Sequence, residues 1–210
     1  MFWLKEKLIS ILNRLGFDFM SSSTFPEKFI QLLKDKGIHS ECELKNHPDT
    51  CCSNITTKVF DFDKTKELFY KEIGLSSSCY CGSVDALYLS KDKSKLFLIE
   101  MKKKNSSKSI GEYISDYFKA DKVPKQFIES IMLMLSIGGY YRLESKFYNY
   151  VLDSSKTRMK AIFLSNCTDR ELNILTIASL HERTFDYTKV ITGKVGIYNC
   201  QSIQNFFNNN

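Results

Sequence analysis

Two acidic residues and a lysine interrupt two apolar segments in the middle of the chain. Asp85 lies within 82–89, and Glu100 and Lys102 lie within 96–102. Both segments are short and rich in β-branched, aromatic and aliphatic residues, so we expect two strands joined as a hairpin by a polar turn. Side chains alternate between the faces of a strand, so Glu100 and Lys102 point the same way. The hairpin predicts that an aspartate, a glutamate and a lysine converge at one end of an apolar sheet.

Buried carboxylates of this kind are costly unless something compensates their charge. A hard divalent cation does so, because Mg²⁺ takes oxygen ligands and is typically held by one or two carboxylates together with substrate phosphates. A nearby ammonium group orients an attacking water or stabilises developing charge, which suits the hydrolysis of a phosphodiester bond. In the alternative interpretation, Asp85 marks the end of a strand, and Glu100 with Lys102 forms a charged, solvated edge.

The two segments resemble the motif of the PD-(D/E)XK nuclease superfamily, which includes restriction endonucleases, archaeal Holliday junction resolvases and RecB-like nucleases. The matching residues are Ser83-Val84-Asp85 and Ile99-Glu100-Met101-Lys102. Val84 stands where the superfamily has the proline that names the motif, and the resemblance directly covers only a short part of the chain. Both acids nevertheless lie inside neighbouring apolar strands, which is the context that the motif requires.

The resemblance implies a role for each of these residues. Asp85 and Glu100 would bind Mg²⁺ or Mn²⁺, the main-chain carbonyl of Met101 would add a ligand, and Lys102 would act on the attacking water. The implied catalytic residues are therefore Asp85, Glu100 and Lys102. The implied fold is α/β, a restriction endonuclease-like core with a mixed central sheet flanked by helices in αββαβ order.

Two helices flank the motif in this plan. The helix expected over 63–73 offers Glu67 or Glu72 as a further metal ligand, although each serves equally well as a surface glutamate. A helix expected over 125–141 follows the motif. The strand expected over 158–165 is predicted to run parallel to an earlier strand, because a helical crossover precedes it.

The basic residues around the motif favour DNA as the substrate. The chain has a formal net charge of +6 and a pI near 8.8, which is compatible with binding to a phosphate backbone. By resemblance to the junction resolvases we expect a homodimer. The alternatives are a RecB-like exonuclease and a non-catalytic nucleic-acid-binding protein on a nuclease-like fold. The candidate DNA-binding residues are Lys103, Lys104, Lys108, Lys125 and Gln126.

The 210 residues and their composition predict a single nuclease-like domain over 1–210. Residues 1–60 form a helical and irregular N-terminal elaboration in this interpretation, and 61–200 form the α/β core. No apolar stretch is long enough to span a membrane. Lys5, Glu6 and Lys7 interrupt the hydrophobic pattern at the N-terminus, which argues against a signal peptide, so we expect an intracellular protein. The further expected elements are helices over 2–15, 26–36, 110–118 and 171–182, an irregular stretch over 40–57, a strand over 189–198 and a polar tail over 205–210 that frays.

Five of the seven cysteines gather ahead of the motif, together with His39 and His47. Zinc would use Cys42, His47 and either Cys51 or Cys52, but paired Cys-x-x-Cys knuckles are missing. An iron–sulfur nuclease would place several cysteines near its C-terminus, where only Cys200 lies. We therefore expect neither structural zinc nor an iron–sulfur cluster. Buried free thiols are the favoured state, with disulfides as the alternative.

Overall fold

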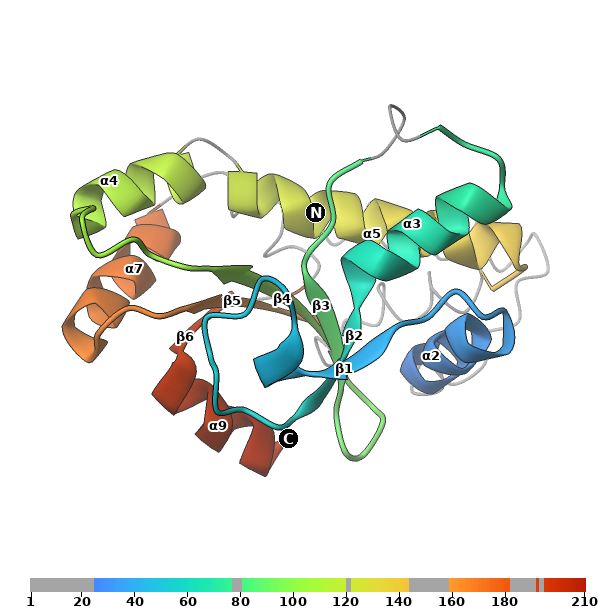
Figure 1. Cartoon of the computed structure of the whole chain (residues 1–210), viewed down its shortest axis with the longest axis horizontal. Helices are drawn as coiled ribbons and strands as arrows, with labels where there is room; N and C mark the ends of the chain where they lie inside the picture. The colour runs from blue at the N-terminus through green and yellow to red at the C-terminus, as the bar shows by residue number, and fades with distance from the viewer. Residues whose placement is uncertain (1–24, 77–80, 120–121, 144–158, 182–191, 193–194) are drawn as a thin grey trace, which may run out of the picture.

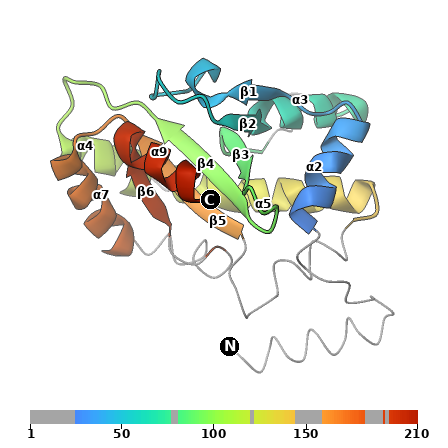
Figure 2. The same ribbon diagram turned by 90° about the horizontal axis from the view of Figure 1, so that it is seen from below.

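The computed structural model describes residues 25–76, 81–119, 122–143, 159–181, 192 and 195–210. These residues build a six-stranded mixed sheet with helices on both faces (Figures 1 and 2). The strands follow one another across the sheet in chain order; β1 to β4 pair antiparallel, and β5 and β6 continue in parallel. Their bounds are β1 Glu41–Glu43, β2 Lys58–Asp61, β3 Ala86–Leu89, β4 Leu96–Lys102, β5 Met159–Ser165 and β6 Gly196–Asn199.

The central hairpin is confirmed. Strands β3 and β4 pair antiparallel, with Ala86 opposite Ile99 and Leu89 opposite Leu96. Strand β5 lies parallel to β4 along its whole length, as the helical crossover predicts. The prediction of a mixed α/β sheet flanked by helices is therefore confirmed.

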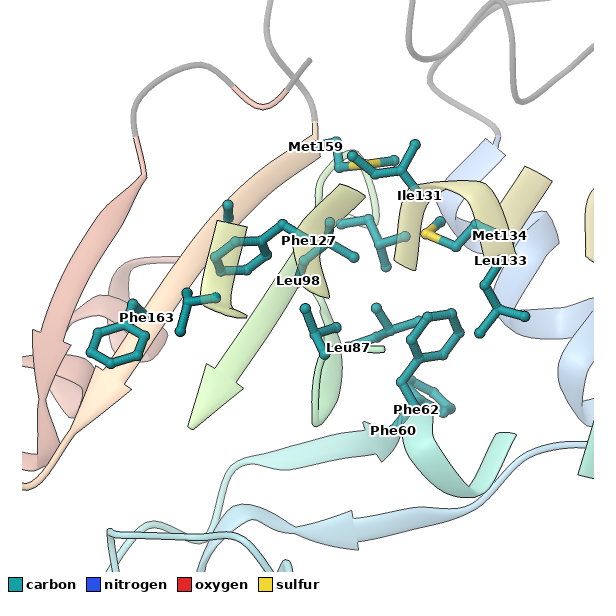
Figure 3. Packing of buried hydrophobic residues seen from close by; sticks show 14 of the residues in the cluster. Phe60, Phe62, Leu87, Leu98, Phe127, Ile131, Leu133, Met134, Met159 and Phe163 are labelled. Carbon is teal, nitrogen blue, oxygen red and sulfur yellow. The ribbon is translucent and has the colours of Figure 1, made fainter. Parts of the chain in front are cut away.

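Helices cover one face of the sheet and enclose the larger of two hydrophobic cores. Figure 3 shows Leu87 and Leu98 of the hairpin on this side, where Phe127 and Leu133 of the long helix α5 also pack. All four side chains are buried, so this face carries most of the apolar packing. The elements on this side are α2 Phe25–Asp35, α3 Phe62–Glu72, α4 Ile110–Ile114, a π-helical turn η4 Ser115–Lys119, α5 Lys122–Tyr140 and α7 Asp169–His181.

The opposite face is covered by the loop after β1 and by helix α9, Cys200–Asn209 (Figure 2). The expectation of a fraying tail over 205–210 is wrong, because α9 runs to Asn209. Phe207 packs on Tyr88 with ring centroids 4.7 Å apart, and Phe206 packs on Phe97 at 4.9 Å. The apolar stripe of this helix is spaced at helical intervals but is diluted by asparagine and glutamine, so the tail looks polar in the sequence.

Several predicted elements are confirmed with small changes at their ends. Helices α3, α5 and α7 correspond to the helices expected over 63–73, 125–141 and 171–182. Helix α2 has Pro26 in its first turn, and Gly37 follows its end with φ 66. The helix expected over 110–118 is α4 continued by η4. The helix expected over 2–15 and part of the strand expected over 189–198 lie outside the described residues.

The stretch expected to be irregular contains structure that the sequence did not predict. Strand β1 and a 3₁₀ turn, η2 Leu44–Asn46, lie within 40–57, and strand β2 follows directly. Both strands extend the sheet beyond β3. In the part of the chain that the structure describes, no helix combines the length and apolar character needed to cross a membrane.

Candidate active site

The three motif residues meet at the end of the central hairpin, on the face that carries the larger core. Asp85 is 3% exposed and Glu100 is fully buried. The Nζ of Lys102 forms an ion pair with Oε1 of Glu100 and lies 3.7 Å from Oδ2 of Asp85. The predicted convergence of an aspartate, a glutamate and a lysine is therefore confirmed.

Backbone contacts fix Asp85 in place. Its main-chain carbonyl accepts a hydrogen bond from the amide of Phe62 at 2.9 Å. Its side-chain Oδ2 accepts a hydrogen bond from the amide of Met101. Because the N–H and C=O of a strand residue point to the same edge, the Met101 carbonyl is directed towards the Asp85 side of β4. This direction agrees with the ligand role that the resemblance implies for that carbonyl.

The two buried carboxylates carry strongly perturbed proton affinities. Burial raises the pKa of Asp85 to about 7, although the nearby Lys102 charge and the Met101 amide act in the opposite direction. Burial, followed by repulsion from Asp85, raises the pKa of Glu100 well above its usual value. Burial lowers the pKa of Lys102, but the two neighbouring carboxylates outweigh this effect and the net direction is upwards. These shifts favour the protonated, neutral form of both carboxyl groups when no cation is bound, and a bound cation would favour their charged form.

Only one of the two carboxylate oxygens of Glu100 has a partner among the described residues. Among the described residues, its Oε2 has neither a hydrogen-bond partner nor an ion-pair partner, and it is buried. Buried polar atoms in native proteins nearly always have a partner, and a buried charged oxygen without one costs several kcal/mol. A metal cation bound at Oε2 would compensate the charge of this carboxylate.

Two further aspartates complete the acidic cluster, and the sequence did not point to either. One carboxylate oxygen from each of Asp49, Asp63 and Asp85 lies within 4.8 Å of the other two. Asp63 occupies the first turn of α3, where it accepts a hydrogen bond from Ser83 Oγ and pairs with Lys66 Nζ at 2.7 Å. Asp49 is exposed and lies in the loop after η2. Carboxylate oxygens in this number and proximity are the donors that Mg²⁺ and Mn²⁺ prefer, so the residues fit such an ion.

His47 links the Asp49 loop to the strand that carries Asp85. Its ring is buried, and its Nδ1 accepts a hydrogen bond from the Asp49 amide at 3.2 Å. The other ring nitrogen, Nε2, therefore carries the proton and donates to the main-chain carbonyl of Asp85 at 3.1 Å. This histidine positions two of the acidic residues relative to one another.

The structure does not bring Glu67 or Glu72 together with Asp85. Both are exposed; Glu67 pairs with Lys64 Nζ at 2.8 Å, and Glu72 accepts a hydrogen bond from Tyr141 at 2.6 Å. Helix α3 begins beside Asp85 and rises away from it by about 1.5 Å per residue. Its first turn therefore supplies the nearby acid, Asp63, and its later turns do not.

The four lysines predicted to bind DNA differ in their exposure and in their ion pairs. Lys103 is exposed directly after β4. Lys104 is mostly buried and pairs with Glu171 at 3.2 Å. The remaining pairs are Lys108 with Asp116 at 2.5 Å and Lys125 with Glu129 at 3.6 Å. Lys103 is therefore the lysine of this group best placed to meet a substrate.

Two side chains of helix α5 form hydrogen bonds with the backbone of the segment that precedes Asp85. Gln126 donates to the main-chain carbonyl of Ser83 at 3.3 Å, and the Val84 amide donates to Ser130 Oγ at 2.7 Å. Gln126 was expected to contact DNA, but in this structure its amide supports the backbone of the motif. Tyr113, also unforeseen, donates to the carbonyl of Lys102 at 2.6 Å and fixes the end of β4.

A comparison of the chain with known protein families, curated proteins and solved structures found no significant match. The geometry of the site and the chemistry of its residues therefore provide the basis for a functional proposal.

Proposed function

We propose that this protein is a metal-dependent deoxyribonuclease that hydrolyses phosphodiester bonds on a restriction endonuclease-like core. The observation that carries the proposal is the contact of a single lysine, Lys102, with two buried carboxylates, Asp85 and Glu100. Raised pKa values on two acids beside one lysine, at the solvent-accessible end of a sheet, are typical of functional sites.

The proposal assigns the metal ligands to four acidic residues. Asp49, Asp63 and Asp85 offer converging oxygens, and Glu100 offers an oxygen without a partner among the residues that the structure describes. When bound, Mg²⁺ or Mn²⁺ polarises a phosphoryl oxygen and lowers the pKa of a coordinated water. Two of the four ligands are buried, so the protein holds their oxygens in place before the substrate arrives.

Lys102 acts as a hydrogen-bond donor in the proposed hydrolysis. Its pKa is raised by Glu100 and Asp85, so its ammonium group keeps its charge at neutral pH. Its side chain is 21% exposed, which lets Nζ reach both the carboxylates and a molecule at the surface. The ammonium group orients the attacking water and stabilises the negative charge that develops on the phosphate.

The surface beside the site suits a DNA strand. Lys103 lines a pocket of about 410 Å³ with Lys104, Asn105, Ser106 and Asn166, immediately after the strand that carries Glu100 and Lys102. Such a pocket offers amide, hydroxyl and ammonium donors to a flanking phosphate. The excess of six positive charges over the whole chain acts in the same direction.

The proposal is tested by cleavage of labelled linear, single-stranded and four-way-junction DNA with Mg²⁺, Mn²⁺ or EDTA. Cutting that requires metal and disappears in Glu100→Ala and Lys102→Ala supports a nuclease, and the preferred DNA identifies its class. A resolvase-like enzyme would cut the junction as a homodimer, and a RecB-like exonuclease would degrade linear ends. Binding in EDTA without cutting under any condition would reject catalysis and favour a DNA-binding protein.

A further inference from the structure

Three cysteine sulfurs meet where the loop after β1 contacts helix α9. Cys52 and Cys200 form a disulfide that joins residues 148 positions apart. The Sγ of Cys51 lies 3.7 Å from the Sγ of Cys52 and 3.9 Å from the Sγ of Cys200. The favoured expectation of free thiols is therefore wrong for this pair, and the sulfurs that gather are not the Cys42 and His47 set that the sequence offered for zinc.

The spacing of these sulfurs matches the geometry of a thiolate metal site. Tetrahedral zinc with Zn–S distances of about 2.3 Å places its sulfur ligands about 3.8 Å apart. Both separations that involve Cys51 already have this value. Only the separation between Cys52 and Cys200 differs, because these two sulfurs are bonded to each other.

We infer that the reduced protein binds one zinc ion through the thiolates of Cys51, Cys52 and Cys200. A small-molecule dithiol supplies the two electrons that convert the disulfide to two thiols, and the dithiol itself becomes a disulfide. Zinc then displaces one proton from each of the three thiols, and a water completes its coordination. The disulfide and the zinc thiolate site are thus alternative states of the same three residues.

The surroundings allow an ion to reach the sulfurs. Cys52 is buried, but Cys51 and Cys200 are partly exposed. Cys200 also lines a pocket of about 340 Å³ with Asn166, Asp169 and neighbouring residues. Three thiolates around Zn²⁺ carry one net negative charge. Burial raises the pKa of the Cys51 thiol to about 12, and the weaker effect of the Lys103 charge does not offset this, so the bound cation itself must favour the thiolate form. The set contains soft sulfur donors only, so it selects zinc rather than the magnesium that suits the aspartates.

Both the disulfide state and the zinc-bound state connect the loop after β1 to helix α9. Cys51 and Cys52 follow Asp49 closely in the loop that also contains His47, and Cys200 opens α9. The inferred site does not depend on the proposed nuclease activity, because it uses separate residues and a separate metal. Its test likewise does not involve DNA cleavage.

The test uses the full chain reduced with a dithiol, with free thiols counted by alkylation and mass spectrometry. Zinc content after removal of unbound metal should be about one ion per chain in the reduced protein and near zero in the oxidised protein. Cys51→Ser and Cys200→Ser should each lose the ion. Cys42→Ser is the matched control, because Cys42 is a free cysteine outside the cluster, and it should keep the ion.

Cobalt provides a second measurement that requires no variant. Co²⁺ bound to thiolates shows a sulfur-to-metal charge-transfer absorption, whereas Co²⁺ bound to carboxylates does not. The reduced wild-type protein should show this absorption, and the oxidised protein should lack it. A reduced protein with all thiols free that binds no zinc and shows no charge transfer would overturn the inference. Retention of zinc by both Cys51→Ser and Cys200→Ser would also overturn it.

Discussion

The amide of Phe62 donates a hydrogen bond to the main-chain carbonyl of Asp85 at 2.9 Å. This bond joins the first residue of helix α3 to the residue that precedes strand β3. The first turn of α3 is thereby held against the acidic cluster, and it presents Asp63 there. The arrangement of the acidic cluster therefore depends on a contact between backbone atoms that are distant in the sequence.

The first prediction concerns the acid that helix α3 contributes. Asp63→Asn should weaken Mn²⁺ binding at least about tenfold, because it removes a charged oxygen from the converging set. Isothermal titration calorimetry with Mn²⁺ measures this affinity. Glu67→Gln is the control on the same helix and should bind Mn²⁺ like the wild type. Equal weakening by both substitutions, or by Glu67→Gln alone, would show that the helix supplies a different ligand.

The second prediction concerns the lysine. Lys102→Met keeps most of the side-chain volume but removes the charge that faces Asp85 and Glu100. We expect cleavage to slow by about 10²-fold or more. We also expect the metal-free protein to lose about 3 kcal/mol of stability in urea denaturation, since unpaired buried charges remain. Adding Glu100→Gln to Lys102→Met should restore part of this stability. A Lys102→Met protein as stable as the wild type would mean that the carboxylates do not depend on the lysine.

The third prediction concerns pH. The pKa of Asp85 rises from 3.8 to about 7 on folding, so between these values the folded protein binds more protons than the unfolded chain. Stability from this group is therefore present at low pH and is lost as pH rises from about 4 to about 7. Glu100 acts in the same direction. Urea denaturation in EDTA should show that Asp85→Asn gains stability relative to the wild type as pH rises through this window. A relative loss would contradict the assignment.

The fourth prediction concerns His47. His47→Ala removes the donor to the Asp85 carbonyl and the acceptor for the Asp49 amide. We expect a loss of about 2 kcal/mol in the free energy of unfolding and weaker Mn²⁺ binding. His39→Ala is the control, because His39 lies in the same part of the chain but is outside the acidic cluster. If His39→Ala weakens Mn²⁺ binding as much as His47→Ala, the positioning role of His47 is wrong.

The sequence predicted what depends on local patterns. Alternation within β3 and β4 places Asp85, Glu100 and Lys102 on one face, and their hairpin turn brings them together without reference to the rest of the chain. Helices with clear apolar periodicity, such as α3 and α5, were predicted within a few residues of their ends.

The features that the sequence missed depend on long-range pairing. Asp63 reaches the site because β2 pairs with β3, and β2 was not predicted. Asp49 reaches it through the buried ring of His47. Cys200 meets Cys52 because α9 packs across the sheet, and an asparagine-rich tail gave little sign of that helix. The one available signal was the position of Asp63 at the helix end nearest the Asp85 strand.

Single-turnover cleavage in Mg²⁺ tests the central claim most directly. The wild type, Glu100→Gln and the exposed control Glu112→Gln should be compared on the DNA that the wild type cuts best. Glu100→Gln keeps the shape of the buried side chain but removes its charge, so cleavage should fall at least about a hundredfold while the protein remains folded. Glu112→Gln should cut like the wild type. Unchanged cleavage by Glu100→Gln would contradict the assignment of the active site to this carboxylate.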